Sequence, residues 1–207
     1  MYLSPVLART AEPIGVHGRR PWFPSPMIDA SKYSVEEMLK NGLRVTVRAI
    51  RPHDKEALLA AFQGLDERTI YLRFFAPKRT LTPRDLKEAT DIDFVRTVAL
   101  VTCLQDSAGG KIIGAGRYTV FGDAEPPDKA EVAFTVEEDY QGLGIASITM
   151  RHLVSIAKEK GIAQFHAEVL AENKGMLAVF DRTGMPVEKR CAEGVVHVTL
   201  SLAGETP

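Results

Sequence analysis

Two glycines between a strand pattern and a helix pattern constrain this chain more than any other feature. Gly142 and Gly144 lie in the hexapeptide Gln141-Gly-Leu-Gly-Ile-Ala146, which follows an alternating run at 130–136 and precedes a helical run at 145–160. Glycine lets backbone N–H groups approach an anion without interference from a Cβ atom. The start of a helix adds unpaired donors and the positive end of its dipole. The hexapeptide therefore predicts a phosphate-binding loop and a phosphorylated cofactor.

The charges of the chain balance. Its 207 residues carry 26 Lys plus Arg against 27 Asp plus Glu, a net charge of −1. Proteins that bind duplex nucleic acid usually carry a strong basic excess, so nucleic acid is not expected as the main partner. No apolar run approaches the ~18 residues of a membrane span, and the N-terminus lacks a secretory pattern. We therefore expect a cytoplasmic protein that does not enter a membrane.

Cysteine and histidine positions give no support for a metal site. Cys103 and Cys191 are far apart, and both lie in strand patterns. We expect buried free thiols rather than a disulfide or a metal-binding pair. The five histidines show no spacing typical of metal ligands. No metal is therefore expected.

Residues 1–40 differ from the rest of the chain. They contain five of its 12 prolines, which interrupt regular elements, so we expect an irregular, proline-rich N-terminal extension. Trp22 and Phe23 are candidates to pin it to the domain surface or to a second subunit of a homodimer. The alternative is a free tail. Residues 41–203 are expected to form the single folded domain.

Periodicity places regular elements from residue 43 onward. Strand patterns lie at 44–50, 97–104, 112–121, 129–136, 164–170, 187–192 and 195–202. Helical patterns lie at 54–65, 66–75, 82–89, 145–160 and 173–183. The order is one strand, two or three helices, three strands, a helix, a strand, a helix and two strands. It predicts an α/β (α+β) fold with a mixed, mostly antiparallel sheet of about seven strands flanked by helices.

Two nucleotide-binding motifs are disfavoured. The loop lacks the third glycine of a dinucleotide fingerprint, and Glu137-Glu-Asp139 separates it from the strand where that fingerprint needs an immediate turn. Four strands also precede the loop, whereas a dinucleotide fold begins with this strand. A P-loop is excluded because no G-K-[ST] follows.

The loop and its place after three antiparallel strands resemble the GNAT superfamily of acetyl-CoA-dependent N-acetyltransferases. The family signature Q/R-x-x-G-x-G/A is met by Gln141, Gly144 and Ala146. Asn173 at the start of the next helix and Gly184 eleven residues later fit the same pattern. The resemblance covers roughly residues 43–202 and implies the GNAT fold with acetyl-CoA as the donor.

Three segments show a closer resemblance. Residues 70–75, 130–136 and 173–176 are similar to the acetyltransferase domain of Pat-type bacterial protein lysine acetyltransferases. Such domains are often joined to a CoA-ligase-like region or to a cyclic-nucleotide-binding module. Neither fits within this sequence. The resemblance implies a protein lysine as the acceptor.

The resemblance also implies how the donor is held. Backbone N–H groups of the loop would bind the pyrophosphate, and Val136 N–H would lie near the thioester oxygen where its strand parts from the next. Thr135 would lie beside the pantetheine arm. The loop residues so assigned are Gln141, Gly142, Leu143, Gly144, Ile145 and Ala146.

Asn173 and Phe180 complete the implied cofactor site. Asn173 is an N-cap candidate on sequence grounds, and in the family this asparagine also hydrogen-bonds the cofactor arm. Phe180 stands where many members carry a tyrosine that protonates the leaving thiolate. A thiol with pKa near 8.5 leaves readily as the thiolate, and Pat-type domains also lack the tyrosine.

Glu131 is the candidate general base. A lysine with pKa near 10.4 is almost wholly protonated at pH 7, so the reaction requires a base. Glu131 precedes Val136 by five residues, about 16 Å at ~3.3 Å per residue, so a bulge and an ordered water would have to bridge the gap. The assignment therefore depends on the Pat-type resemblance. The alternatives are a solvated or salt-bridged role for Glu131, or Glu168 as the base.

Other charged residues have two interpretations each. Glu137, Glu138 and Asp139 are typical of a solvated turn, although one of them could contact a cationic substrate. Arg73, with Tyr71 and Phe74, either lines the acceptor side or belongs to a packed amphipathic helix.

Three functions remain open. The preferred one is direct transfer of acetyl from acetyl-CoA to a primary amine, a protein lysine. The second keeps the chemistry and changes the acceptor to a small amine such as a polyamine, an antibiotic or an amino acid. The third is a non-catalytic acyl-CoA-binding regulator.

Overall fold

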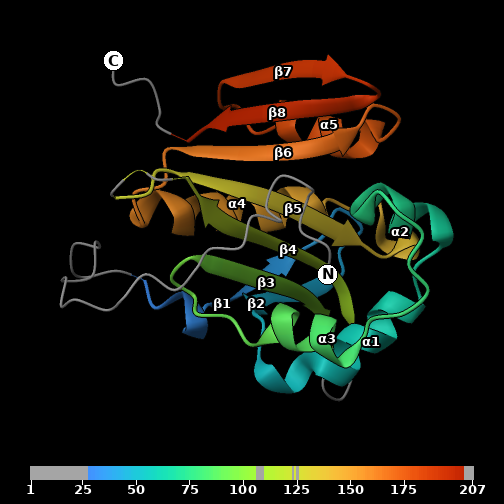
Figure 1. The fold of residues 1–207 in the computed structure, drawn as a ribbon. Helices are drawn as coiled ribbons and strands as arrows, with labels where there is room; N and C mark the ends of the chain where they lie inside the picture. Colours follow the sequence, from blue (N-terminus) through green and yellow to red (C-terminus); the bar gives the residue numbers. More distant parts are fainter. Residues whose placement is uncertain (1–27, 106–109, 123, 125, 203–207) are drawn as a thin grey trace.

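The computed structural model describes residues 28–105, 110–122, 124 and 126–202, and an eight-stranded sheet forms the centre of this part (Figure 1). The spatial order of the strands is β1-β2-β3-β4-β5-β6-β8-β7. All neighbouring pairs are antiparallel except β5 and β6, which are parallel. The mixed, mostly antiparallel sheet predicted from the sequence is confirmed, with one strand more. The bounds are Ser34–Met38 (β1), Arg44–Ala49 (β2), Thr97–Leu104 (β3), Ile112–Phe121 (β4), Lys129–Val136 (β5), Gln164–Leu170 (β6), Val187–Ala192 (β7) and Val195–Ser201 (β8).

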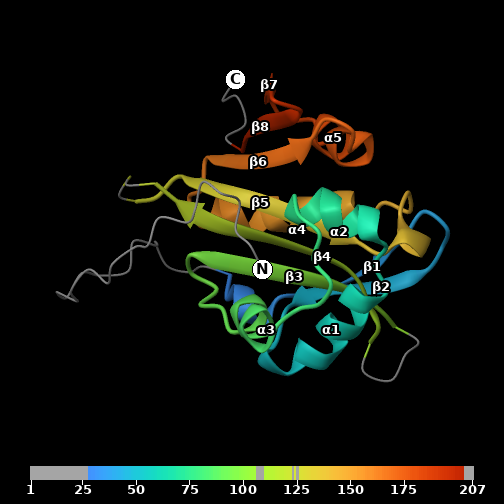
Figure 2. The ribbon, with the colours of Figure 1, turned by 45° about the vertical axis from the view of Figure 1, so that its right-hand side comes forward.

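Helices cover both faces of the sheet. Figures 1 and 2 show α1, α2 and α3 over one face, and α4 and α5 against the other. The helices α4 and α5 share the main hydrophobic core with the sheet, including Leu153, Phe165 and Phe180. The bounds are Lys55–Gln63 (α1), Glu67–Phe74 (α2), Pro83–Thr90 (α3), Ile145–Glu159 (α4) and Lys174–Asp181 (α5).

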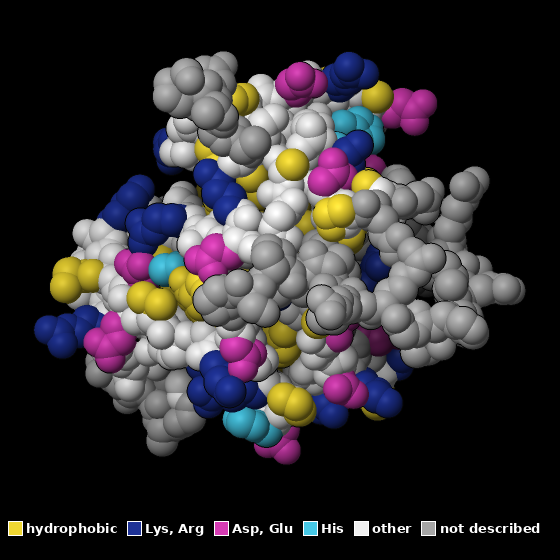
Figure 3. Space-filling view, turned by 90° about the vertical axis from the view of Figure 1, so that its left-hand side faces the viewer, with side chains coloured by type: hydrophobic (Ala, Val, Ile, Leu, Met, Phe, Trp, Pro, Cys, Tyr) yellow, Lys and Arg dark blue, Asp and Glu magenta, His cyan; other side chains and the backbone are white. Residues whose placement is uncertain are grey.

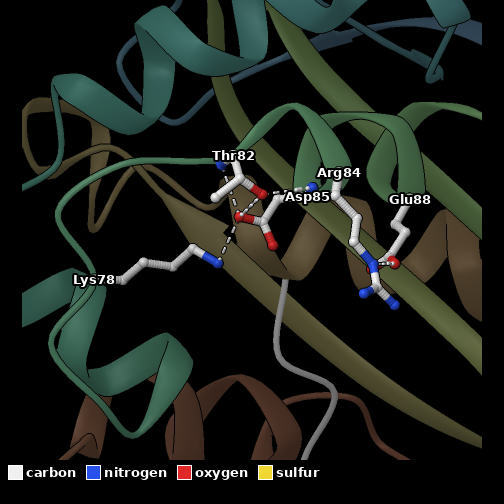
Figure 4. A network of polar contacts seen from close by, with 5 residues as sticks. All are labelled: Lys78, Thr82, Arg84, Asp85 and Glu88. Carbon is white, nitrogen blue, oxygen red and sulfur yellow. Dashed lines mark hydrogen bonds and ion pairs between the residues drawn. The ribbon is translucent and has the colours of Figure 1, made fainter.

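The start of α3 is fixed by a polar network (Figure 4). Thr82 N donates to Asp85 Oδ2 (2.7 Å) and Asp85 N donates to Thr82 Oγ1 (3.1 Å), a capping box. Lys78 Nζ lies 3.0 Å from the same Asp85 oxygen, and Arg84 pairs with Glu88 one turn further on at 2.8 Å. These contacts therefore fix the connection between α2 and α3 to the first turn of α3.

The N-terminal part of the sheet differs from expectation. Residues 34–38 form the edge strand β1, paired in register with β2 from Ser34↔Arg48 to Met38↔Arg44. The prediction of an irregular segment up to residue 40 is therefore wrong for β1. The side chains of this strand are mostly exposed, so it shows no alternation of buried and exposed residues. The strand forms because its backbone pairs with β2. The predicted contacts of Trp22 and Phe23 lie outside the described residues.

Two glycines of β4 bring α4 close to the sheet. A Cβ atom on Gly114 would lie 2.6 Å from Ile145 Cγ2, and one on Gly116 would lie 2.7 Å from Thr149 Cγ2. Both distances are shorter than real Cβ contacts, so a side chain at either position would push the helix away. These glycines set the height of α4, and therefore of its N-terminus, above the strands.

The strands β5 and β6 pair over only part of their length. Their register covers Lys129↔Gln164, Ala130↔Phe165 and Glu131↔His166. Beyond these residues β5 continues to Val136 and β6 to Leu170, and Figure 1 shows the two strands diverging. The sheet therefore opens beside the C-terminal half of β5.

The surface carries charges of both signs. On the face seen in Figure 3, basic and acidic side chains of the described residues alternate with uncharged and hydrophobic ones. Cys103 is buried as expected, but Cys191 is exposed because it lies on the edge strand β7. In the described part of the chain, no helix has the length and hydropathy needed to cross a membrane.

Candidate functional site

The glycine loop has the predicted strand–loop–helix geometry. Gly142 and Gly144 adopt φ values of +76° and +98°, a left-handed conformation that favours glycine. Gly144 is the N-cap of α4, and its carbonyl accepts from Ile148 N at 2.9 Å. The first N–H groups of a helix have no intrahelical partner. An anion at this end of α4 would therefore meet free donors and the positive end of a 15-residue helix.

The side chain of Gln141 anchors this loop. Its Nε2 donates to Val136 O and to Thr69 Oγ1, both at 3.2 Å. A second link joins the same regions, because Glu138 Oε1 accepts from Asp66 N at 3.0 Å. The glycine loop is therefore tied to the end of β5 and to the start of α2.

Lys40 brings a cation to the loop, which sequence reasoning missed. Lys40 N donates to Leu143 O at 3.2 Å, and Lys40 Cε lies 3.6 Å from the position of a Cβ on Gly144. The residue stands in the turn between β1 and β2, about a hundred positions from the loop. No local signal could have placed it there.

The backbone of β5 offers donors to the opening. Glu137 N donates to Ile113 O at 3.0 Å across the ladder to β4. Because backbone groups alternate in direction along an antiparallel strand, Thr135 N–H also points to β4. The N–H groups of Phe134 and Val136 then point to the other side, where β6 has diverged. Val136 N–H therefore faces the gap, as its predicted role requires.

Glu131 lies at the last paired position before the strands diverge. It stands opposite Thr119 on β4 and His166 on β6. Burial and the charge of Glu168 raise the pKa of Glu131, and the guanidinium groups of Arg73 and Arg117 offset part of this rise. The result is a half-buried carboxyl with a raised pKa, which suits a general base that must also release its proton.

Arg73 and Arg117 surround this carboxyl from two other elements. Arg117 on β4 donates through NH2 to Thr119 Oγ1 at 3.2 Å, which directs it toward the strand position opposite Glu131. Arg73 on α2 lies over the Phe74 ring, with Cζ 5.1 Å from the centroid. Burial and the charge of Arg117 lower the pKa of Arg73 to about 10. Arg73 therefore packs on its own helix and also lines a cavity, and a role on the acceptor side stays a prediction.

That cavity lies between α1, α2 and the sheet. It encloses about 780 Å³ of empty space, part of which is open to solvent. Its wall is mostly apolar, with Leu58, Phe62 and Leu65 from the helical side. The polar residues among those that line it are Arg73, Arg117, Thr135 and Glu137.

Glu137 does not belong to a solvated turn, contrary to the sequence-based prediction. It is 8% exposed, whereas Asp139 is exposed. Its N–H continues the β5 ladder to Ile113 O, so its side chain follows the alternation of Glu131, Ala133 and Thr135 onto the cavity face. Lys111 Nζ lies 2.6 Å from Glu137 Oε1.

Comparison with known proteins identifies the family. Residues 67–185 match the sequence profile described as the acetyltransferase (GNAT) family. The chain belongs to the GNAT acetyltransferase family. The enzyme class and the acetyl-CoA donor expected from the glycine loop are those of this family.

Individual relatives support the Pat-type resemblance. An acetyltransferase of Pseudomonas aeruginosa is 29% identical over 140 residues, which are 68% of this chain and 74% of that protein. Acetyltransferase Pat of Mycolicibacterium smegmatis is 33% identical over 138 residues, 67% of this chain but only 40% of that protein. The crystal structure of the GNAT domain of S. lividans PAT is 34% identical, with a TM-score of 0.74, and covers 81% of this chain and 96% of that domain.

Asn173 and Phe180 occupy different environments in this GNAT domain. Asn173 is the N-cap of α5, with its Oδ1 accepting from Met176 N at 3.1 Å, as predicted. Phe180 is 1% exposed and packs in the main core. The contacts of both residues with the cofactor stay predictions. In the described part of the chain, no group of three His, Cys, Asp or Glu side chains is arranged to hold a metal ion.

Proposed function

We propose that this GNAT protein transfers an acetyl group from acetyl-CoA directly to the ε-amine of a protein lysine. One observation carries the proposal: the opening between β5 and β6 has the anion-binding start of α4 at one end and the half-buried carboxyl of Glu131 at the other. The similarity to two Pat proteins supports lysine as the acceptor.

The residues present fit acetyl-CoA. The left-handed glycines and the start of α4 suit its pyrophosphate, with Lys40 as an additional cation. The N–H groups of Phe134 and Val136 face the gap, where they can pair with an extended amide-bearing arm. A single oriented donor at a developing oxyanion is typically worth about 3 to 4 kcal/mol.

Proton transfer falls to Glu131 in this proposal. The strand β5 runs without a bulge from Glu131 to Val136, so the amine loses its proton through a chain of ordered waters that ends at the Glu131 carboxylate, as its nitrogen bonds to the acyl carbon. The carbon–sulfur bond breaks and the electron pair leaves with sulfur as a thiolate. No side-chain acid is required for that departure, because a thiol has a pKa near 8.5.

The cavity favours a second candidate, a small-molecule amine. Its mostly apolar wall, with a few polar groups from Arg73, Thr135 and Glu137, is typical of small-ligand sites. Incubating the full chain with acetyl-CoA and either a bacterial protein mixture or a panel of small amines separates the two candidates. We expect acetyl-lysine in proteins by mass spectrometry. Turnover of small amines without any modified protein lysine would replace the proposal with the second candidate.

A further inference from the structure

Glu137 is a buried carboxylate with one oxygen unused. Oε1 lies 2.6 Å from Lys111 Nζ and beside the connection from α1 to α2, 3.9 Å from the position of a Cβ on Gly64. Oε2 is buried, and no donor among the described residues lies within hydrogen-bond distance of it. Most buried polar atoms in folded proteins have a partner, so such an atom requires an explanation.

The surroundings of Oε2 point to a ligand. Glu137 lines the cavity between α1, α2 and the sheet, and it is the one anion among the described lining residues. The other charged lining groups, Arg73 and Arg117, are cations. A positively charged guest is therefore repelled by the arginines and attracted to the carboxylate.

The apolar wall defines the rest of the guest. Leu58, Phe62 and Leu65 offer a surface for methylene groups, whose burial away from water is favourable. A carboxylate at one end of an apolar cavity fits a primary alkylammonium. The side chain of lysine has this form, with four methylenes below the charge.

The position along β5 places that charge near the reacting groups. Glu137 follows Val136, whose N–H faces the opening between β5 and β6. Glu131, in contrast, lies about 16 Å before Val136 at ~3.3 Å per residue. The two carboxylates are therefore separated by nearly the length of the strand, so one nitrogen cannot contact both: Glu137 can hold the amine, and its proton reaches Glu131 through ordered waters.

We propose that Glu137 binds the ammonium group of the acceptor through Oε2 and so selects a primary alkylamine, before the proton of that group passes through ordered waters to Glu131. This inference rests on the proposed function and names the acceptor chemistry of the same site. It gives Glu137 a role in acceptor affinity, distinct from the rate of the chemical step.

The test uses the full chain with Nα-acetyl-lysine amide as the acceptor probe. Loss of a hydrogen bond to a charged group costs about 1.5 to 3 kcal/mol, so Glu137→Gln is expected to raise the KM for the amine about 10- to 100-fold. The KM for acetyl-CoA is expected to stay within about twofold. Asp139→Asn, the same charge change at an exposed neighbour, is the matched control and is expected to stay near wild type.

The variant Lys111→Met distinguishes two roles of Glu137, which are binding of the acceptor amine and a purely structural ion pair with Lys111. If Oε2 binds a cation, removal of the competing Lys111 charge strengthens that binding and lowers the KM for the amine. If the pair only supports the fold, Lys111→Met raises this KM in the same direction as Glu137→Gln. That parallel rise, an unchanged amine KM in Glu137→Gln, or a rise in the acetyl-CoA KM instead would each overturn the proposal.

A binding measurement makes this test independent of turnover. Calorimetry on the CoA-bound protein compares Nα-acetyl-lysine amide with the uncharged Nα-acetyl-norleucine amide. We expect wild type to prefer the charged ligand at least about 10-fold and Glu137→Gln to lose that preference. A wild type that binds the lysine ligand through Glu137 but turns over no amine contradicts the proposed function alone. Turnover with no dependence on Glu137 contradicts this inference alone.

Discussion

Gln141 Nε2 and Thr69 Oγ1 lie 3.2 Å apart, so the glycine loop is hydrogen-bonded directly to the helix α2. The same nitrogen donates to Val136 O at the end of β5. Arg73, one turn after Thr69, lines the cavity beside the sheet. A single amide therefore joins the loop expected to hold the donor to the helix expected to line the acceptor side.

This bridge predicts that Thr69→Val affects both substrates. Valine keeps the shape of threonine and removes the acceptor, at a cost of about 0.5 to 1.5 kcal/mol. We expect KM values for acetyl-CoA and for the amine to rise together, by about two- to tenfold. Thr97→Val, which removes a long 3.4 Å contact to Thr119, is the matched control. A rise in only one KM would show that the two sides are not coupled through Gln141.

The left-handed glycine at the start of α4 predicts a specific loss of donor binding. Gly144→Ala places a Cβ at φ +98° beside the stem of Lys40, and a left-handed conformation costs an L-residue about 1 to 2 kcal/mol. We expect a lower unfolding midpoint and a KM for acetyl-CoA raised at least about 10-fold.

Gly122→Ala is the control for that strain. Gly122 has φ +90°, and a Cβ atom added there would meet no other atom within 4 Å. It lies in the loop after β4. A comparable loss of stability with unchanged KM for acetyl-CoA is expected. Equal KM effects in both variants would mean that the loop does not contact the donor.

The charges around Glu131 predict the acid side of the pH profile. The carboxylate is the active form, so activity is present above the pKa of Glu131 and is lost as pH falls through it. Burial and Glu168 raise this pKa, and Arg117 is one of the two cations that lower it. Arg117→Gln should therefore raise the pKa further and move the acid limb of kcat/KM to higher pH.

The control for this shift is Arg96→Gln, which removes one positive charge from an exposed position. Its acid limb should coincide with that of wild type. If Arg117→Gln leaves the limb in place, or moves it to lower pH, Glu131 is not the group that the profile reports.

Two substitutions of Asn173 can separate its role as the N-cap of α5 from a contact with the cofactor. Asn173→Ala removes the acceptor for Met176 N and should destabilise the protein by about 1 kcal/mol. Asn173→Asp keeps the cap, so its stability should match wild type in chemical denaturation. If Asn173→Asp nevertheless raises the KM for acetyl-CoA, the amide group contacts the donor. An unchanged KM in both variants would limit Asn173 to the helix cap.

The parts of this fold that could be predicted are those with local causes. Glycines at positive φ, alternation along β5 and the cap at Asn173 act within a few residues, so the segments at 129–136, 145–159 and 174–181 were predictable. The strand β1 was not, because mostly exposed side chains give it no pattern and its partner β2 orders it.

The site residues follow the same division. Lys40 reaches the glycine loop only through the β1–β2 turn, which no sequence pattern indicates. The prediction for Glu137 was wrong because three successive acidic residues are typical of a solvent-exposed turn. A signal was nevertheless present, since Glu137 continues the every-second-residue series of Glu131, Ala133 and Thr135.

The rate of acetyl transfer by Glu131→Gln tests the central claim most directly. Glutamine keeps the size and hydrogen bonding of the side chain but cannot accept the proton. The measurement is kcat for Nα-acetyl-lysine amide, together with the affinity for CoA in the same preparation. A catalytic base predicts a fall in kcat on the order of 100-fold or more with CoA affinity little changed. An unchanged kcat would remove Glu131 from the mechanism and contradict the account.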